Sequence, residues 1–348
     1  MAGEIVLVSR GARSREEDQA SHLLRFPSHW RAAPVVNPAE MRIERETLEW
    51  LAAHGMGTSP AEREKLRKFE CGKYGGYSLP RAPLPEALLV TQFISLWLFW
   101  DDVEVEDHTD WSIDDVAAAF TAGPSPSTNS YVMAWNDVAS RLRARGSARW
   151  LARLAESMRE WLGNAQHETK LGMALRKRAE WPSLETLFEC RTVSIGMYPT
   201  FYLIEIAEHL ELPDEFHEHD LVKDLKRTAS RLVGIGNDLG GLAKDLKSGW
   251  LNLVVALAHG ASIRIDEAFG RLVEIHNREV LDFDRAAARL PSFGEKLDPL
   301  VQTWLEAVRY SVYGFALWES CAERYQEYTA LVEGRPLRAM LTIDASAV

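Results

Sequence analysis

The sequence predicts an all-α protein, a single-domain bundle of roughly ten helices. Three observations support this prediction. Apolar residues recur at helical spacing over most of the chain, the breaks between these stretches coincide with clusters of proline and glycine, and no series of alternating apolar and polar residues indicates strands. Because bundles build their ligand and metal sites from side chains on facing helices, a functional site is expected between helices.

The predicted elements follow the chain in order. Residues 1–20 are polar and charged and are interpreted as a mobile tail, and residues 21–348 as one helical domain. In the first predicted helix, Ile43 and Leu51 belong to the apolar face and Gly55 is the expected stop. Helices are expected within residues 39–56, 86–100, 149–175, 183–207, 221–246, 251–260, 262–290 and 297–325.

The composition excludes several classes of protein. The chain has 348 residues, of which 46% are hydrophobic, and a formal net charge of −11, which argues against nucleic acid as a partner. No apolar run approaches the roughly 20 residues of a membrane span, and the N-terminus lacks the layout of a signal peptide. The three cysteines are far apart, so neither a disulfide framework nor a zinc site is expected. These observations favour a cytoplasmic protein and leave a homodimer open.

An acidic run ends the apolar stretch 86–100. The sequence "LFWDDVEVEDHTDW", Leu98–Trp111, contains six acidic residues within ten positions, and Asp102 and Glu106 share one helix face. Carboxylates so close together repel one another, so this cluster needs a source of positive charge. Such a group of hard oxygen ligands suits Mg²⁺. The alternative is a solvated helix end with surplus acid.

A second polar patch lies in "GIGNDLGGLAKDLKSGWLN", residues 234–252. Asn237, Gly241 and Asp245 are spaced i, i+4 and i+8, which places them on one stripe of a helix and makes them a candidate second metal site. Each of the four glycines in this helix costs about 0.8 to 1 kcal/mol relative to alanine, so a close approach of backbone, ligand or water should compensate. Lys244 and Lys247 lie beside the stripe and could reach an anion.

This pair of patches resembles the motifs of class I terpene synthases, the bacterial branch in particular. The first motif of that family, DDxxxE, matches through Asp101, Asp102 and Glu106. The second, NDxxSxxxE followed by Lys, Gly and Asn, matches through Asn237, Asp238, Lys244, Gly249 and Asn252. The chain departs from it at Gly241, where Ser is usual, and at Asp245, where Glu is usual. Each departure weakens one ligand, and a water molecule could replace the missing hydroxyl.

Two further features extend the resemblance over nearly the whole chain after the tail. Arg191 stands 46 residues before Asn237, where the family has an arginine that senses diphosphate, and Ser194 and Ile195 then fall on the linker and effector positions. The family also ends in a tryptophan followed by an Arg-Tyr pair, which Trp318, Arg324 and Tyr325 match. Four motifs in the right order and spacing are much more specific than any one of them.

The resemblance implies a cluster of three Mg²⁺ ions shared with a substrate diphosphate, and these ions would supply the positive charge that the acidic run needs. The implied metal ligands are Asp101, Asp102, Glu106, Asn237, Gly241 (through water or backbone) and Asp245, although Asp102 suits the orientation of an arginine better. Arg191, Lys244, Arg324 and Tyr325 would donate hydrogen bonds to the diphosphate.

The implied reaction is the ionisation and cyclisation of a linear allylic diphosphate, with farnesyl diphosphate favoured over geranylgeranyl diphosphate. Aromatic rings stabilise a passing cation without trapping it, and the candidates are Phe93, Trp97, Phe188 and Trp318. Ordinary core packing is the alternative for each ring.

Two other functions compete with cyclisation. A chain-elongating prenyltransferase usually carries two Asp-rich motifs, whereas the second patch here reads Asn-Asp-Gly-Asp, which favours cyclisation. A non-catalytic helical interaction protein would not need Arg191 and the Arg-Tyr pair at these offsets.

Overall fold

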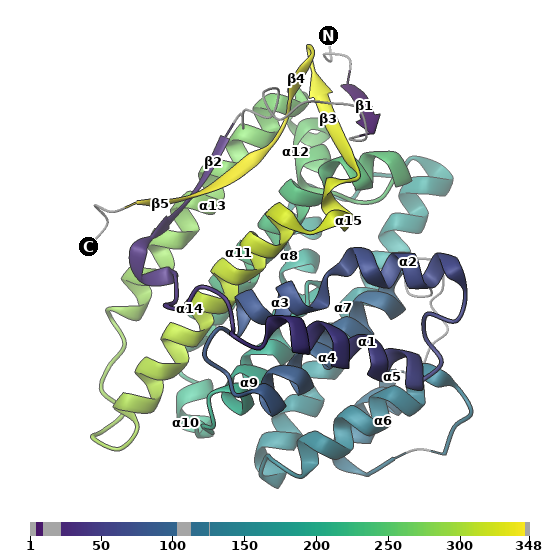
Figure 1. Ribbon diagram of the computed structural model, residues 1–348. Coiled ribbons are helices and arrows are strands. Elements are labelled where there is room, and N and C mark those ends of the chain that lie inside the picture. Colours follow the sequence, from purple (N-terminus) through teal and green to yellow (C-terminus); the bar gives the residue numbers. More distant parts are fainter. Residues whose placement is uncertain (1–4, 10–21, 103–112, 125, 345–348) are drawn as a thin grey trace.

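The computed structural model describes residues 5–9, 22–102, 113–124 and 126–344, and over them the predicted all-α fold is confirmed (Figure 1). None of the described helices is long and apolar enough to cross a membrane. The helices are α1 Glu40–Ala53, α2 Pro60–Phe69, α3 Cys71–Ser78, α4 Leu84–Trp100, α5 Ile113–Thr121, α6 Ser130–Arg143, α7 Ala148–Arg178, α8 Leu184–Ser194, α9 Met197–Ala207, α10 Asp214–His217, α11 Asp220–Ser248, α12 Leu253–Ala261, α13 Ile265–Ala287, α14 Asp298–Cys321 and α15 Glu323–Gln326.

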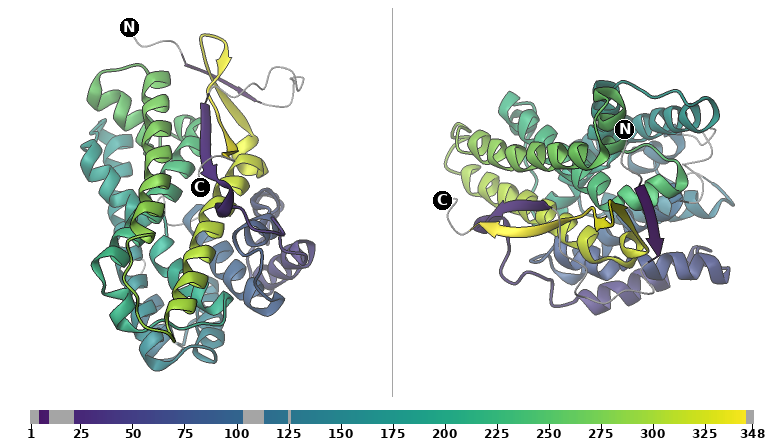
Figure 2. Two further views of the ribbon diagram at one scale, coloured as in Figure 1. Left: turned by 90° about the vertical axis from the view of Figure 1, so that its left-hand side faces the viewer. Right: turned by 90° about the horizontal axis from the view of Figure 1, so that it is seen from above.

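Five short strands were not predicted. Antiparallel pairing joins β1 Ile5–Ser9, β3 Tyr328–Val332 and β4 Arg335–Pro336, in the spatial order β1-β3-β4, and β2 His22–Pro27 runs parallel to β5 Ala339–Asp344. Both sheets lie along the outside of the helices (Figure 2). The interpretation of residues 1–20 as a mobile tail therefore does not hold for β1, whose Ile5 lies opposite Val332. These strands were missed because each is short and because β1 and β2 pair with segments from the other end of the chain.

Two helices carry the acidic patches into the middle of the bundle. Buried residues of α4 occur around its whole circumference, as expected for a helix that is apolar on every side. The other helix, α11, packs against α13 and α14 and ends at Gly249, whose φ of +67° suits a glycine at this position. Each motif is therefore held by several packed neighbours: α4 contacts α1, α3, α6 and α9, and α11 contacts α8, α9, α12, α13 and α14.

The predicted helix 183–207 is broken in two. Between α8 and α9, Gly196 adopts a φ of +86°, a left-handed conformation that ends the helical hydrogen bonding. A Cβ atom at this position would lie 3.2 Å from the Trp161 ring. The Trp161 Nε1 also donates a hydrogen bond of 2.9 Å to the carbonyl oxygen of Ser194. The break is thus fixed by one glycine and one tryptophan of α7.

One buried histidine gives the fold a predictable dependence on pH. His276 of α13 is 1% exposed and packs edge-on against Phe26 of β2, with ring centroids 5.3 Å apart. Burial lowers the pKa of His276 to about 4, from 6.5 in the unfolded chain. Between these two values the unfolded state binds more protons, so the free energy of unfolding falls as the pH falls through that window.

Between pH 7 and pH 4, the free energy of unfolding should fall by up to about 3 kcal/mol more in the wild-type protein than in the His276→Leu variant. The reason is that the histidine contributes about 1.4 kcal/mol for each unit of its pKa shift. Urea unfolding of both proteins across this range measures the difference. Parallel pH profiles would show that His276 does not contribute to it.

Candidate active site

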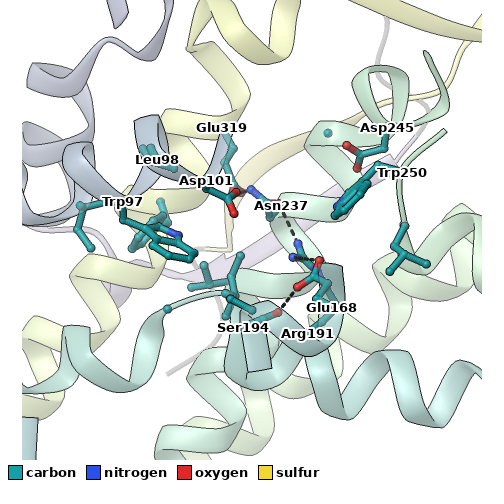
Figure 3. Close-up of a pocket in the computed structure, with 18 of the residues that line it drawn as sticks. Trp97, Leu98, Asp101, Glu168, Arg191, Ser194, Asn237, Asp245, Trp250 and Glu319 are labelled. Carbon is teal, nitrogen blue, oxygen red and sulfur yellow. Dashed lines mark hydrogen bonds and ion pairs between the residues drawn. The ribbon is translucent and has the colours of Figure 1, made fainter. Parts of the chain in front are cut away.

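A cavity of about 110 Å³ lies where α4, α7, α11 and α14 meet, beside the break between α8 and α9 (Figure 3). It brings together most of the site residues that the sequence predicted, from segments as far apart as α4 and α15. The predicted residues that line it are Trp97, Asp101, Arg191, Ser194, Ile195, Asn237, Gly241, Lys244, Asp245, Trp318, Arg324 and Tyr325.

Arg191 is the centre of a buried hydrogen-bond network. Its guanidinium donates to Glu168 Oε1 at 3.0 Å, to Asn237 Oδ1 at 3.0 Å and to Asp238 Oδ1 at 2.6 Å. Although burial by itself lowers the pKa of Arg191, the neighbouring carboxylates Asp238 and Glu168 raise it well above its ordinary value. Arg191 is therefore a permanent cation in the cavity wall, held in place by α7 and α11.

Asp238 ties this network to the segment that follows α11. Its Oδ2 accepts a hydrogen bond of 2.7 Å from the backbone NH of Leu253, and its carbonyl oxygen accepts one of 2.8 Å from Asn252 Nδ2. Asp238 is only 1% exposed and is not among the residues that line the cavity. The second residue of the Asn-Asp pair is therefore structural, and Asn237 is the one presented to the cavity.

The predicted stripe Asn237, Gly241 and Asp245 lines the cavity along α11. A Cβ atom at Gly241 would lie 3.2 Å from Asp245 Oδ2, so the glycine leaves the space directly beside that carboxylate open. Asp245 Oδ2 also accepts a hydrogen bond of 2.8 Å from Asn252 Nδ2. Burial raises the pKa of Asp245 to about 7 even though Lys244 and Asn252 act to lower it. This carboxyl group is thus placed where a bound cation would stabilise its ionised form.

The two neighbouring acids at the end of α4 have different surroundings. Asp101 lines the cavity and points into it, whereas Asp102 does not line it (Figure 3). Asp102 Oδ1 accepts from Arg324 Nη2 at 3.2 Å and lies 3.5 Å from Lys244 Nζ. Burial favours the neutral acid, but Arg324, Lys244 and Lys65 outweigh it and lower the pKa of Asp102 to about 2.

The assignment of Asp102 as a metal ligand is therefore not supported, because its carboxylate is already occupied by cations. Its contact with Arg324 fits the interpretation that Asp102 orients an arginine. The third acid of the first motif, Glu106, lies outside the described residues.

Two of the predicted aromatic residues do not reach the cavity. Phe93 is fully buried among other rings and stacks at 6.1 Å on Trp161, which itself lines the cavity. The guanidinium carbon of Arg231 lies 4.6 Å above the centroid of the Phe188 ring, and Phe188 is also absent from the cavity lining. In this structure Phe93 lies in the layer behind the wall and Phe188 packs against Arg231, so their contact with the substrate stays a prediction.

Several lining residues were missed by sequence reasoning. Glu168 of α7 accepts hydrogen bonds from both Arg191 and the Ser194 hydroxyl, and it thereby links the arginine to the helix break. Glu319 of α14 is 4% exposed, and burial raises its pKa to about 8, although a hydrogen bond from Asn237 acts to lower it. The missed rings of the lining are Trp161, Trp250 and Phe315.

Only Glu319 left a signal in the sequence. It directly follows Trp318 of the predicted motif, and its acidic side chain lies on the buried side of α14. Glu168 lies in a long helix among many polar residues, where nothing in the local pattern distinguishes it.

The oxygen atoms of this cavity fit a divalent metal ion. Carboxylate oxygens of Asp101 and Asp245 and the amide oxygen of Asn237 belong to the class of ligand that Mg²⁺ prefers. Among the described residues, no three side chains of His, Cys, Asp or Glu converge on one point. A metal ion here would therefore need amide and external oxygen atoms, as the phosphate groups of a substrate provide.

Comparison with known proteins agrees with this geometry. The model of terpene synthase family 2, C-terminal metal binding, matches residues 92–282, which is more than half of the chain and includes both motifs. The chain is 25% identical over 300 residues to (+)-T-muurolol synthase ((2E,6E)-farnesyl diphosphate cyclizing) of Roseiflexus castenholzii, covering 84% of this chain and 90% of that protein. It is 24% identical over 307 residues to 10-epi-cubebol synthase of Sorangium cellulosum, covering 85% of this chain and 96% of that protein.

A solved structure shares the fold. The crystal structure of 2-methylisoborneol synthase from Streptomyces coelicolor A3(2), in complex with Mg²⁺ and 2-fluoroneryl diphosphate, matches with a TM-score of 0.72 and 21% identity, covering 84% of this chain and 94% of that one. The motifs, the cavity that unites them and the family match all agree, and the chain therefore belongs to terpene synthase family 2 and is a class I terpene cyclase, a lyase that acts on an isoprenoid diphosphate.

Proposed function

We propose that this terpene cyclase ionises farnesyl diphosphate in the cavity at the end of α4 and closes the resulting C15 cation into a ring. The observation that carries the proposal is the composition of the cavity wall. Metal-binding oxygens of Asp101, Asn237 and Asp245 share the cavity with diphosphate donors and with aromatic rings. An allylic diphosphate needs a polar surface for its diphosphate and an apolar surface for its hydrocarbon chain, and this cavity provides both.

The metal ligands of the proposal come from two helices. Asp101, directly after α4, and the pair Asn237 and Asp245 on α11 would hold Mg²⁺, with three ions in the complete complex. When bound, these ions neutralise the charge that develops on the departing diphosphate. Gly241 would contribute space rather than a side-chain ligand, because no atom of its own extends beyond the backbone.

Four other side chains would bind the diphosphate directly. Arg191 offers a guanidinium whose planar donors match phosphate oxygens, and Arg324 offers a second. Lys244 and Tyr325 line the same cavity and would add a point charge and a hydroxyl donor. Donors that are already oriented by Glu168 and Asp102 need little rearrangement when negative charge develops, and this favours ionisation.

The bonds that break and form in the proposed reaction are those of the substrate. The allylic C–O bond breaks, both of its electrons leave with the diphosphate oxygen, and the chain becomes an allylic cation. A double bond of the same chain then attacks the cationic carbon and closes a ring, and loss of a proton or addition of water ends the sequence. Rings such as Trp97 and Trp318 would stabilise the cation and exclude water until the ring has closed.

The length of the substrate rests on two observations. The named relative from Roseiflexus castenholzii cyclises farnesyl diphosphate. The cavity of about 110 Å³ is also smaller than the roughly 300 to 1,000 Å³ of typical ligand pockets. The wall must open for any prenyl chain to enter, and a C15 chain requires less opening than a C20 chain.

Incubation with Mg²⁺ and each of the C10, C15, C20 and C25 allylic diphosphates tests the proposal. Released diphosphate and extracted products are measured together, the latter by gas chromatography and mass spectrometry. A cyclic C15 product formed fastest from farnesyl diphosphate is expected. Turnover that requires added isopentenyl diphosphate would identify a chain-elongating enzyme, and faster cyclisation of the C20 substrate would overturn the assignment of length.

Trp97 provides a test of the cavity wall. It is 7% exposed, lines the cavity and lies one turn before Asp101, with its ring 4.2 Å from that of Trp161. We expect Trp97→Ala to change the ratio of products more than the rate of diphosphate release. Ionisation depends on charge at the rim, whereas the fate of the cation depends on rings that can each contribute up to about 2 kcal/mol.

Phe93→Leu is the matched control, because Phe93 lies on the same helix one turn earlier but behind the wall. It should lower the melting temperature and leave the product ratio unchanged. If Trp97→Ala also lowers only the melting temperature, Trp97 is a core residue and has no part in guiding the cation.

A further inference from the structure

The side chain of Asn237 is fixed by two acceptors on the C-terminal helices. Its Nδ2 donates one hydrogen bond of 3.1 Å to Glu319 Oε1 and another of 3.0 Å to the Tyr325 hydroxyl. Both amide hydrogens are thereby used. Glu319 is 4% exposed and lies outside both metal motifs, so its burial beside Asn237 requires an explanation of its own.

These contacts allow only one orientation of the amide. Arg191 carries only donors, so the group facing it at 3.0 Å must be the oxygen Oδ1. Rotating the amide by half a turn would place Nδ2 against the Arg191 guanidinium, a contact between two donors, and would remove the hydrogen bond from Nδ2 to Glu319 Oε1. A carboxyl oxygen accepts from Nδ2 whether or not the acid is ionised. The hydrogen bond to Glu319 thus favours the orientation in which Oδ1, which has two lone pairs and accepts one hydrogen bond from Arg191, is the ligand atom.

The glycines of α11 allow this contact to form. A Cβ atom at Gly236 would lie 3.1 Å from Glu319 Oε2, which is closer than side chains normally pack, whereas one at Gly240 would lie 3.6 Å from Glu319 Cβ, an ordinary contact. The close approach of α11 to the acid of α14 explains why a helix interior tolerates a glycine at position 236. The glycine and the buried acid are thus parts of one arrangement.

We propose that Glu319 is a positioning residue that orients the amide of Asn237 for binding of a divalent metal ion, and that Gly236 provides the space it needs. This inference rests on the proposed function, in which Asn237 is a metal ligand. Groups that orient a metal ligand typically contribute 10-fold to 100-fold to metal affinity. The effect should therefore be on metal binding, without any contact between Glu319 and the metal ion.

The test measures binding without turnover. The melting temperature of the intact protein is followed while Mg²⁺ is titrated at a fixed concentration of inorganic diphosphate, and the titration gives an apparent Mg²⁺ affinity. Glu319→Leu, which removes the acceptor, should weaken this affinity roughly 10-fold to 100-fold. Glu319→Gln, which keeps an oxygen acceptor for Asn237 Nδ2, should stay close to the wild-type protein.

A second pair of variants leaves Glu319 itself unchanged. Gly236→Ala should displace the Glu319 carboxyl group, and its Mg²⁺ affinity should fall between those of Glu319→Gln and Glu319→Leu. Gly240→Ala makes the same chemical change one turn later and should bind Mg²⁺ as the wild-type protein does. Both alanine substitutions favour the helix equally, so a difference in Mg²⁺ affinity between the two variants reports the contact with Glu319.

The outcomes separate a failure of the proposed metal site from a failure of the proposed role of Glu319. If the wild-type protein gains no stability from Mg²⁺ and diphosphate, the proposed metal site fails and this inference fails with it. If the wild-type protein is stabilised and Glu319→Leu, melting normally without ligand, binds Mg²⁺ equally well, the inference alone is wrong. Should Glu319→Leu not fold, equal Mg²⁺ affinities of Gly236→Ala and Gly240→Ala would overturn it instead.

Discussion

Replacing Asn237 by alanine is expected to lower the rate of diphosphate release at least about 100-fold while the fold remains intact. The change removes the amide oxygen that lines the cavity, and it adds no bulk. Arg191 keeps its hydrogen bonds to Glu168 and Asp238, so the network around it survives. Steady-state release of diphosphate from farnesyl diphosphate measures the effect, and circular dichroism with thermal melting confirms the fold.

Asp101→Ala should have an effect of the same size, because it removes a carboxylate from the other side of the same cavity. Asp114→Ala is the control, since that side chain is 89% exposed on α5 and is not part of the lining. It should retain wild-type activity. Normal turnover in a folded Asn237→Ala or Asp101→Ala variant would refute the assignment of these residues to the metal site.

Replacing Arg191 is expected to have the second large effect, on activity and stability together. Arg191→Lys keeps a positive charge but cannot reproduce the three directed hydrogen bonds to Glu168, Asn237 and Asp238. We expect a loss of about 100-fold or more in the rate of diphosphate release and only a modest fall in the melting temperature.

Arg191→Leu should instead destabilise the protein by about 3 to 5 kcal/mol, because it leaves Glu168 and Asp238 buried without their cation. Arg231→Lys is the control, because this arginine of α11 pairs with Glu279 at 2.8 Å and does not line the cavity. If Arg191→Lys retains the full rate, the oriented guanidinium plays no part in binding the diphosphate.

Sequence periodicity predicted the helices that matter most for the site. The predicted ranges 86–100 and 221–246 fall within α4 and α11, because they follow from apolar periodicity, which depends on the local geometry of one helix. The spacing of Asn237, Gly241 and Asp245 likewise needs only 3.6 residues per turn to place them on one stripe. For this reason the second motif could be assembled before any packing was known.

The aromatic wall could not be predicted in the same way. Phe93 and Trp97 are one turn apart on α4, and the sequence assigned both to the substrate. Because α4 is apolar on all sides, its pattern contains no polar face that would distinguish the core from a cavity. Only the packing of α7, which places Trp161 between Phe93 and the cavity, separates the two rings.

The partners of the charged residues also depended on distant segments. The sequence indicated that Asp102 orients an arginine, but its pairing with Arg324 joins residues 222 positions apart, and that of Arg191 with Glu168 joins two different helices. The strand pairing of β1 with β3 connects the two ends of the chain. Helical periodicity contains no information about such contacts.

By itself the sequence determined the helical fold, the two metal motifs and the family to which they belong, because helix periodicity and motif spacing are properties of contiguous residues. The tertiary structure decided that Asp101 and not Asp102 lines the cavity, that Trp97 and not Phe93 bounds it, and that Glu168 and Glu319 hold its two central side chains. Each of these outcomes depends on which helices pack together, and packing is settled by the burial of surfaces from the whole chain.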